Sequence, residues 1–403
     1  MFSRTVVATA AVALVLACVT DVTEGAEVGL GSPAPGLAPR SLLCYIASWN
    51  GKFRAQDLNP DLCTMTVACY GRLEENGSLR EGSGQEEIRL LEGLKALKTT
   101  KRFDLALSIG GWAEGSERFS AMAADPAMRR TFIESVIKFV DRYDLKGVEV
   151  SWIAPTRRGG KPTDRANFVT LVTELSRALR ALPTPVRMGV ALPVINENLE
   201  NKVLEAFDVT ALAPHADWML VQGYDLHGHW DFFTDVNAPL YSVRPNDNVT
   251  VSHLLKAFLS VAPSQRLFLG MPAFGRTWVL ADSPVPGGLG ARTELGALFS
   301  DAGMLSYQQI CQDFKKDEDD EDERQWSKSW DPVSKTPYAV TNTRERRGFV
   351  SYDDPQSIRI KVKFAQDFGM GGAALFTVDN DDYSGLCGTP YPLTRAAQSA
   401  LQD

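Results

Sequence analysis

Histidine is scarce in this chain, with four residues among 403, and the motifs that commonly carry metal, nucleotide or serine-hydrolase chemistry are missing as well. There is no glycine-rich phosphate loop, no nucleophile elbow and no His-Glu-x-x-His sequence. His227 and His229 form one short His-x-His pair, which is a weak pattern for a metal site. We therefore expect neither a metal ion nor a cofactor.

The sequence also has no basic patch interleaved with aromatic residues, and its formal net charge is -8. Both features argue against a nucleic-acid partner. The charge comes largely from seven consecutive acids at 317–323, because the chain would be nearly neutral without them. Like charges in a block repel one another, so this run predicts a solvated, mobile loop. The alternative is a docking site for a basic partner or for Ca²⁺.

The clearest long apolar run lies at the N-terminus, where Arg4 precedes residues 6–17. That pattern predicts a secretory signal peptide at 1–25, because the run is too short for a membrane span. A lipoprotein cleavage site ending at Cys18 is the alternative interpretation. Residues 26–40 contain many Gly, Pro and Ser residues and predict a flexible leader. We expect a secreted, extracellular protein that has no membrane span and is a monomer.

Six cysteines are present, and five remain once the signal peptide is removed. In an oxidising compartment this number allows two disulfides and one unpaired thiol. Cys69 lies within the apolar run at 66–70 and has the character of a small buried hydrophobic residue. The sequons at Asn76 and Asn248 predict glycosylation on surface loops.

The length of the chain allows one large α/β barrel or two to three smaller domains. Eight short apolar segments rich in strand-forming residues occur, most of them followed by a helical pattern: 42–47, 65–70, 104–109, 147–153, 186–192, 218–224, 267–273 and 372–378. Eight such units predict a closed (β/α)8 TIM barrel. The clearest helices start at Asp125-Pro126 and near Asp164. The interval from about 277 to 348 is too long for a simple connection and must fold on its own.

The segment Lys146-Gly-Val-Glu-Val-Ser-Trp-Ile-Ala-Pro155 resembles the signature strand of glycoside hydrolase family 18, the chitinases and chitinase-like lectins, whose usual run is D-G-x-D-x-D-W-E-x-P. The resemblance places Ile153 where the family has its catalytic glutamic acid. Ser151 then replaces the aspartate that orients the acetamido group of the sugar, and Glu149 takes the first carboxylate position. The family uses substrate-assisted catalysis, which still requires a protein acid as proton donor. The chain is thus similar to inactive animal chi-lectins and imaginal disc growth factors.

Strand geometry supports this interpretation of the segment. Alternate side chains share a face, so Glu149, Ser151 and Ile153 are expected to point into the barrel, with Ile153 at its carboxyl-end mouth. The carboxylate of Glu149 should begin roughly 13 Å deeper, beyond hydrogen-bond reach of a sugar at the mouth. We therefore expect Glu149 to be a buried acid held by polar groups of the barrel.

Further motifs extend the resemblance over about residues 41 to 395. They include Leu107-Ser-Ile-Gly-Gly-Trp112, Tyr224-Asp225-Leu-His-Gly228 and the aromatic positions of the first two strands. The resemblance implies a carbohydrate site made of Tyr45, Trp49, Tyr70, Gly111, Trp112, Gln222, Tyr224, Asp225, Phe274, Arg276 and Phe376. At its centre the chain departs from the family, because Phe376 replaces a tryptophan, Gln222 a methionine and Phe274 a tyrosine. Taken alone, the aromatics Tyr45, Tyr70 and Phe376 would be interpreted as barrel packing, because aromatic residues inside barrels usually serve the core.

The resemblance also implies two disulfides and a domain organisation. The pairs would be Cys44 with Cys63 and Cys311 with Cys387. A small α+β insertion at 277–348, between strand 7 and its helix, would form one wall of the substrate cleft. The barrel would comprise 41–276 and 349–395, followed by a tail at 396–403.

Three functions remain open on the sequence alone. The first is a secreted, catalytically inactive lectin for chitin or N-acetylglucosamine oligomers. The second is a growth-factor-like or signalling protein that uses the barrel to bind a protein receptor without useful sugar affinity. The third is residual hydrolase activity through an unusual acid. The fold cannot separate them, because function lies in the site.

Overall fold

The computed structural model describes residues 37–49, 51–80, 86–193, 204–244, 247–281, 288–294, 296, 303–319, 326–342 and 347–403. The expected signal peptide at 1–25 and residues 26–36 of the expected leader lie outside the described residues. The remaining residues of that leader, 37–40, directly precede the first strand.

Eight parallel strands close into a barrel, which confirms the predicted fold class. Their order around the barrel is β1-β14-β7-β6-β5-β4-β3-β2. The strands are β1 (Ser41–Ala47), β2 (Met65–Gly71), β3 (Leu105–Gly110), β4 (Gly147–Ser151), β5 (Arg187–Leu192), β6 (Trp218–Gln222), β7 (Leu267–Pro272) and β14 (Gly372–Phe376). All eight coincide with the predicted segments to within two residues at each end.

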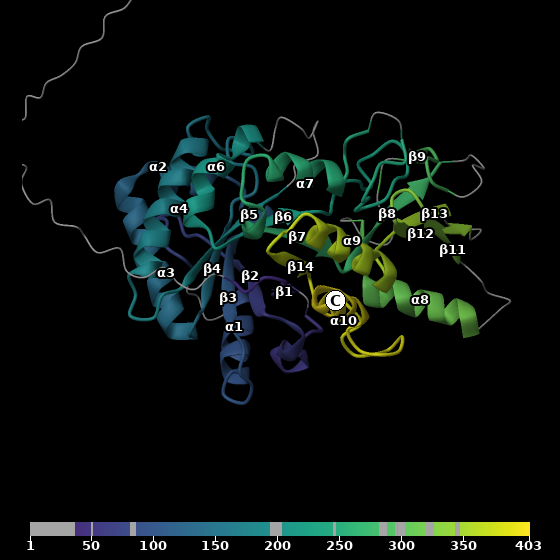
Figure 1. The fold of residues 1–403 in the computed structure, drawn as a ribbon, viewed down its shortest axis with the longest axis horizontal. Coiled ribbons are helices and arrows are strands. Elements are labelled where there is room, and N and C mark those ends of the chain that lie inside the picture. The colour runs from purple at the N-terminus through teal and green to yellow at the C-terminus, as the bar shows by residue number, and fades with distance from the viewer. Residues whose placement is uncertain are drawn as a thin grey trace, which may run out of the picture. The chain divides into compact units, whose positions relative to one another are not determined.

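Helices surround these strands (Figure 1). The α-helices of the barrel are α1 (Glu86–Leu97), α2 (Glu117–Ala124), α3 (Pro126–Tyr143), α4 (Asp164–Arg180), α6 (Val209–Leu212), α7 (Val251–Leu259), α9 (Pro355–Asp367) and α10 (Pro392–Gln402). Short 3-10 turns lie at η1 (Ala55–Asp57), η2 (Pro60–Leu62), η3 (Trp112–Glu114), η4 (Ala213–His215) and η5 (Ser264–Arg266).

Helix α3 illustrates how the local sequence sets an element. The Asp125 carboxylate accepts hydrogen bonds from the amides of Ala127 and Met128, and a proline occupies the first helical position. The helix ends at Asp144, whose left-handed conformation has φ 49°. Its buried face includes Phe132 and Val136, and burial of such side chains contributes about 1.5–3 kcal/mol each.

The barrel strands separate two apolar regions. One face of each strand packs against the surrounding helices, as Val148 and Val150 of β4 do. The other face fills the barrel interior, where Leu43, Val67 and Trp218 lie in one cluster. Gly189 makes room for that tryptophan, because a Cβ atom at 189 would lie 2.1 Å from the Trp218 ring.

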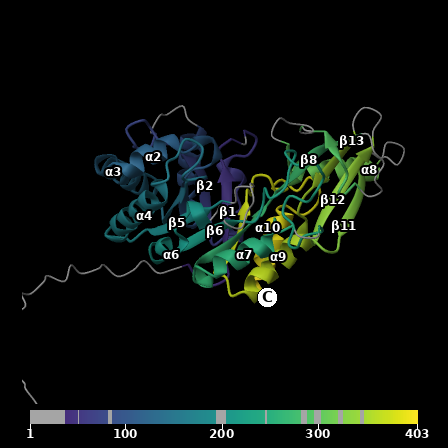
Figure 2. The same cartoon turned by 90° about the horizontal axis from the view of Figure 1, so that it is seen from above.

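A second sheet is built from antiparallel strands in the order β10-β8-β13-β12-β11, with β9 pairing on β8. Its elements are β8 (Phe274–Leu280), β9 (Thr293–Glu294), β10 (Met304–Ser306), α8 (Tyr307–Asp319), β11 (Trp326–Asp331), β12 (Thr336–Asn342) and β13 (Arg347–Ser351). In Figure 2, β8, β11, β12, β13 and α8 lie together. This sheet takes in three residues beyond each end of the expected 277–348 insertion, whose status as a separate domain remains a prediction.

Two expectations about the ends of elements are wrong. The first acids of the run at 317–323 are helical, because α8 continues to Asp319, with Ile310 and Phe314 buried on its inner side. The Asp317 carboxylate accepts the amide of Trp326 at 2.7 Å, which ties the helix end to β11. Residues 320–323 of the run lie outside the described part of the chain. Residues 396–402 of the expected tail instead belong to α10, whose Ala397 is fully buried.

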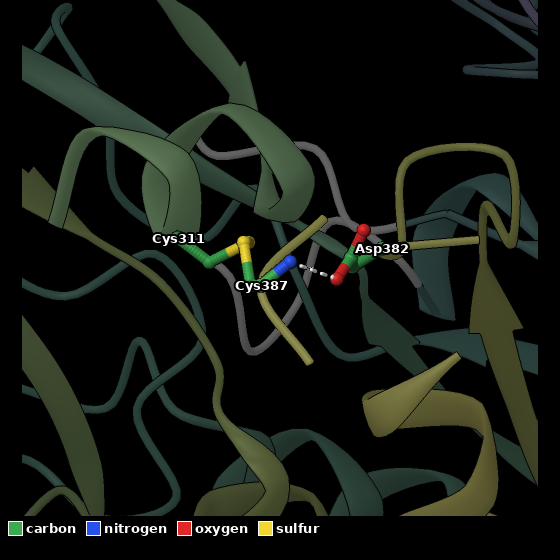
Figure 3. Close-up of side chains that lie close together, drawn as sticks. All are labelled: Cys311, Asp382 and Cys387. Atoms are coloured by element: carbon green, nitrogen blue, oxygen red, sulfur yellow. Dashed lines mark hydrogen bonds between the residues drawn. A yellow bond between two sulfur atoms is a disulfide. The ribbon is translucent and has the colours of Figure 1, made fainter. Parts of the chain in front are cut away.

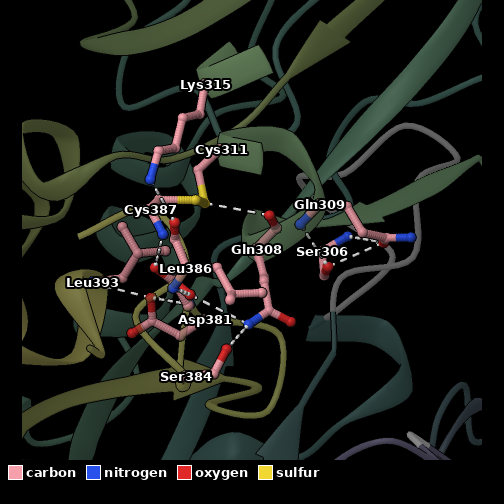
Figure 4. The surroundings of a disulfide bond; sticks show 11 residues. Ser306, Gln308, Gln309, Cys311, Lys315, Asp381, Ser384, Leu386, Cys387 and Leu393 are labelled. Atoms are coloured by element: carbon pink, nitrogen blue, oxygen red, sulfur yellow. Dashed lines mark hydrogen bonds between the residues drawn. A yellow bond between two sulfur atoms is a disulfide. The ribbon is translucent and has the colours of Figure 1, made fainter. Parts of the chain in front are cut away.

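Both implied disulfides are present, and Cys69 is buried and free. Cys311 of α8 is bonded to Cys387 in the segment after β14, and the amide of Cys387 donates to Asp382 at 2.8 Å (Figure 3). Around this bond, Gln308 donates to the Ser384 hydroxyl and Lys315 donates to the carbonyl of Leu386 (Figure 4). The disulfide thus fastens α8 to the segment that follows β14, the barrel strand that ends at Phe376.

Candidate carbohydrate site

The fourth strand ends at Ser151, two residues earlier than expected, and the chain then turns away. Trp152 Nε1 donates to the Ser116 hydroxyl at 3.0 Å, and that hydroxyl donates to the carbonyl of Ala154 at 2.9 Å. Ala154 has a positive φ of 62°, which no strand residue adopts. Ile153 is therefore just beyond the strand rather than in it, and its side chain is buried with 5% exposure.

Glu149 is held inside the barrel by three donors, as expected from the sequence. Its carboxylate accepts hydrogen bonds from the hydroxyls of Tyr45 (2.6 Å) and Ser108 (2.7 Å) and from Trp218 Nε1 (2.8 Å). Burial raises the pKa of Glu149, and the three hydrogen bonds oppose that rise because they favour the ionised form. Burial and the charge of Glu149 together raise the pKa of Tyr45 well above its usual value, so the phenol remains a donor.

An aromatic cluster lies where several barrel strands meet, and Phe376 at the end of β14 is at its centre. The ring centroid of Phe376 lies 5.3 Å from that of Tyr224, 5.8 Å from that of Tyr45 and 6.5 Å from that of Tyr70. Phe274 of β8 meets Tyr224 edge to face at 5.8 Å. The structure thus brings together five residues that the sequence assigned to one site.

The hydroxyl of Tyr224 is buried in this cluster and makes no hydrogen bond with the described residues. Burial raises the pKa of Tyr224 well above its usual value, so the group stays protonated and can donate. An unpaired buried hydroxyl costs about 1–3 kcal/mol. The neighbouring ring of Phe376 is only partly buried, so part of the cluster is open to solvent. A ligand oxygen that accepted a hydrogen bond from the Tyr224 hydroxyl would remove that cost.

The two tryptophans assigned to the site differ in their surroundings. Trp49 is exposed and stacks on Tyr70, with ring centroids 5.8 Å apart. Trp112 is 64% exposed, but the Arg158 guanidinium lies 3.9 Å from its ring centroid. A ligand could therefore stack on Trp112 only at the face that the arginine leaves open. Gly111 has a positive φ of 79°, and a Cβ there would come within 2.5 Å of the Tyr70 ring.

Polar groups flank the cluster at the junction with the second sheet. Arg276 of β8 donates to the carboxylate of Asp225 at 2.7 Å, and its guanidinium also lies 5.4 Å from the Trp230 ring centroid. Gln222 is half-buried at the end of β6. The pair formed by Asp225 and Arg276 therefore stands beside the aromatic cluster as an ordered donor and acceptor.

Comparison with known proteins agrees with this arrangement. The model of glycosyl hydrolases family 18 matches residues 41–381. This chain belongs to that family. It is 32% identical over 381 residues to an endochitinase of Manduca sexta, covering 88% of this chain and 66% of that protein. The chain described here therefore matches slightly less than two thirds of the length of the Manduca sexta protein.

Solved structures of family 18 proteins are also similar. The Group IV chitinase of Ostrinia furnacalis superposes with a TM-score of 0.82 at 27% identity, covering 90% of this chain and all of that chain. Human YKL-39, described as a pseudo-chitinase with retained chitooligosaccharide binding properties, superposes with a TM-score of 0.77 at 26% identity and the same coverage. The family thus includes both enzymes and a protein described as a pseudo-chitinase.

The two histidines of the His-x-His pair have separate partners in this family 18 chain. His227 contacts the Asp231 carboxylate through Nδ1 at 3.2 Å, whereas the His229 ring packs against Trp230. Among the described residues, His227, Asp235 and Asp247 form one group that could hold a metal ion. A second group contains Cys311 and Cys387, whose sulfurs are already bonded to each other (Figure 3).

Burial lowers the pKa of His227, but the hydrogen bond to Asp231 and the charges of Asp235 and Asp247 outweigh it, so the pKa is raised overall. Arg244 lies 3.0 Å from the carboxylate of Asp235 and neutralises part of this acidic surrounding. His227 therefore links the loop after β6 to the segment before α7, where its Nε2 lies 3.3 Å from the carbonyl oxygen of Val249.

Several residues around the site were missed by sequence reasoning. Trp218 holds Glu149, and its position at the start of an apolar strand gave no signal of that bond. Arg158 covers part of Trp112, and Trp230 and Phe232 are exposed on the loop after β6, Phe232 by 66%. An aromatic-rich stretch between two polar turns could have indicated this exposed loop.

None of the helices in the described part of the chain is both long and apolar enough to cross a membrane.

Proposed function

We propose that this family 18 protein is secreted, binds chitin or N-acetylglucosamine oligomers at the carboxyl end of its barrel and does not hydrolyse them. The buried, unpaired hydroxyl of Tyr224 carries the binding part of the proposal, because the acetamido oxygen of such a sugar is an acceptor that would satisfy it. The partly buried Phe376 and the exposed Trp49 supply ring faces for the sugar. Asp225 and Arg276 supply polar contacts.

The absence of turnover rests on the residues of the signature segment. Ile153 cannot donate a proton, and Ser151 cannot support a positively charged intermediate as a carboxylate would. Glu149 is 1% exposed, and its oxygens are occupied by three donors. These contacts argue against Glu149 as a replacement acid.

Secretion, glycosylation and a monomeric state are further parts of the proposal. Two disulfides are consistent with an oxidising compartment. Asn76 and Asn248 are both exposed, so each sequon is accessible to a glycan. The apolar N-terminal run supplies the secretion signal.

Titration with chitotetraose or chitohexaose, followed by tryptophan fluorescence, tests the proposed binding. Trp49 is the expected reporter, since its exposed ring stacks on Tyr70 of the cluster. A saturable change is expected, and the same titration with a Tyr224→Phe variant should give weaker binding. No spectral change at millimolar oligosaccharide would eliminate the lectin function.

A signalling function through a protein partner is the second candidate. The loop carrying Phe232 and Phe233 favours it, because exposed aromatic rings on a fixed backbone are frequent binding anchors. That backbone is fixed by buried Thr234, whose amide donates to the carbonyl of Ala291 at 2.9 Å. This candidate would be supported if the protein bound no oligosaccharide but bound a protein receptor, and if the Phe232→Ala substitution weakened that binding.

Residual hydrolysis is tested with a fluorogenic chitobioside. We expect release no faster than in buffer alone. Steady release that disappears in a Glu149→Gln variant would instead identify Glu149 as an acid and overturn the proposed inactivity.

A further inference from the structure

A pocket of about 530 Å³ opens at the amino-terminal ends of β2, β3 and β4, at the opposite end of these strands from the aromatic cluster. Four of its lining side chains are cationic, although the whole chain carries a net negative charge. The lining residues on which the inference rests are Asp61, Lys98, Lys101, Arg102, Asp104 and Lys146, together with Asp144.

One carboxylate in this pocket is shared by two lysines. Lys98 Nζ lies 2.6 Å from one oxygen of Asp144, and Lys146 Nζ lies 2.6 Å from the other. The Lys98 ammonium also donates to the backbone carbonyl of Asp144 at 2.6 Å. Two ammonium groups around one carboxylate leave an excess positive charge, and these contacts fix its position.

The remaining charges of the pocket add to this excess. The Asp104 carboxylate is paired with Arg187 at 2.9 Å. Lys101 and Arg102 are exposed, and neither forms an ion pair with another residue in the described ranges. Within the lining, four cationic side chains stand against the three carboxylates of Asp61, Asp104 and Asp144, one of which is already paired with Arg187. The pocket therefore has an electrostatic preference for an anionic ligand.

The frame that carries these groups is rigid. Asp104 and Lys146 immediately precede β3 and β4, where the Thr66 amide donates to the carbonyl of Asp104 and the Lys146 amide donates to that of Leu105. Cys63, which also lines the pocket, is held by its disulfide to Cys44 of β1. Binding groups mounted on strand ends need little reorganisation to receive a ligand.

We propose that this pocket binds a phosphate or sulfate group through Lys101 and Arg102, with Lys98 and Lys146 supplying the remaining positive field. Arg102 offers a planar pair of donors that matches such an anion, and Lys101 offers a mobile ammonium. Because the site is at the other end of the strands, it can be occupied while the aromatic cluster holds a neutral sugar. The protein would then join a neutral oligosaccharide to an anionic molecule.

The experiment is a calorimetric titration of the chain without its signal peptide, with four probes: inorganic phosphate, inorganic sulfate, glucose 6-phosphate and glucose 6-sulfate. The test variant is Lys101→Ala with Arg102→Ala. The matched control is Arg130→Ala with Lys138→Ala, which removes the same charges from exposed positions on α3. We expect at least one probe to bind the parent and the control alike, and the test variant to bind it about tenfold more weakly.

The probe that binds most tightly distinguishes phosphate esters from sulfate esters and free ions from sugar-borne groups. Binding should weaken as salt is increased, since the pocket is open to solvent. An equal loss of affinity in test and control variants would overturn the proposal, because it would mean general attraction to surface charge. Absence of binding by all four probes at millimolar concentration would overturn it as well. Chitotetraose affinity should be unchanged in the test variant, so failure here is distinguishable from failure of the proposed lectin function.

Discussion

The ring of Tyr224 lies nearly parallel to the ring of Phe376, with centroids 5.3 Å apart and an interplanar angle of 19°. The hydroxyl of the same tyrosine has no hydrogen-bond partner among the described residues. Phe376 therefore supports the residue expected to recognise the sugar and also offers its own ring to the ligand.

Replacement of Phe376 by alanine should weaken binding of chitotetraose. The variant loses a stacking face and frees the Tyr224 ring to move, so we expect an affinity loss of about 1 kcal/mol or more, roughly fivefold or greater in Kd. Calorimetry or tryptophan fluorescence measures it. Phe368→Ala, at a half-exposed ring just beyond α9, is the matched control and should bind normally. Equal affinities in parent and Phe376→Ala protein would remove Phe376 from the site.

Glu149→Gln should destabilise the barrel without altering its fold. A glutamine amide presents one oxygen and one NH₂ group to three donors, so at least one donor loses its acceptor. We expect the free energy of unfolding to fall by about 1–3 kcal/mol in urea denaturation. Glu134→Gln on the exposed side of α3 provides the comparison and should change stability little. A Glu149→Gln protein as stable as its parent would contradict the assigned hydrogen bonds.

Restoring the family acids with Ile153→Glu and Ser151→Asp should give a folded protein with poor chitinase activity. The new glutamate begins in a buried position just beyond β4, so stability should fall. The central subsite retains Phe376 and Gln222, and a misplaced reacting group can cost about a hundredfold in rate. Release from a fluorogenic chitobioside measures the outcome. Activity equal to that of an ordinary family 18 chitinase would mean that the surrounding substitutions matter little.

The His227 cluster should make stability depend on pH. Because the folded-state pKa of His227 is raised above its ordinary 6.5, its stabilising effect is complete below about pH 6.5 and is lost as pH rises through the folded-state pKa. The neighbouring charges are Asp231, Asp235, Asp247 and Arg244.

Thermal unfolding of the parent and of a His227→Gln variant across the neutral range measures this effect. The difference in stability between the two proteins should shrink as pH rises. A parent-minus-variant difference that grows with pH would refute the assigned direction.

Much of the barrel could be predicted because each strand carries its own apolar pattern. The segments at 65–70 and 267–273 needed no knowledge of their neighbours to be recognised, and the Asp125-Pro126 cap fixed the start of α3. The end of β4 was missed because it depends on Ser116, which binds the turn beyond the strand from another part of the chain. The helical ends at Asp319 and Gln402 were missed for a similar reason, since packing overrides a polar composition.

The sequence by itself determined that eight strands alternate with helices, and it predicts that the aliphatic residue Ile153 stands at the position of the family's acid. Only the tertiary structure decided which side chains meet: Trp218 with Glu149 across 69 residues, and Phe376 with Tyr224 at the cluster. Local periodicity is encoded by neighbours in the chain. Hydrogen bonds inside a closed barrel instead depend on strand order and register, which bring distant residues together only once the sheet has closed.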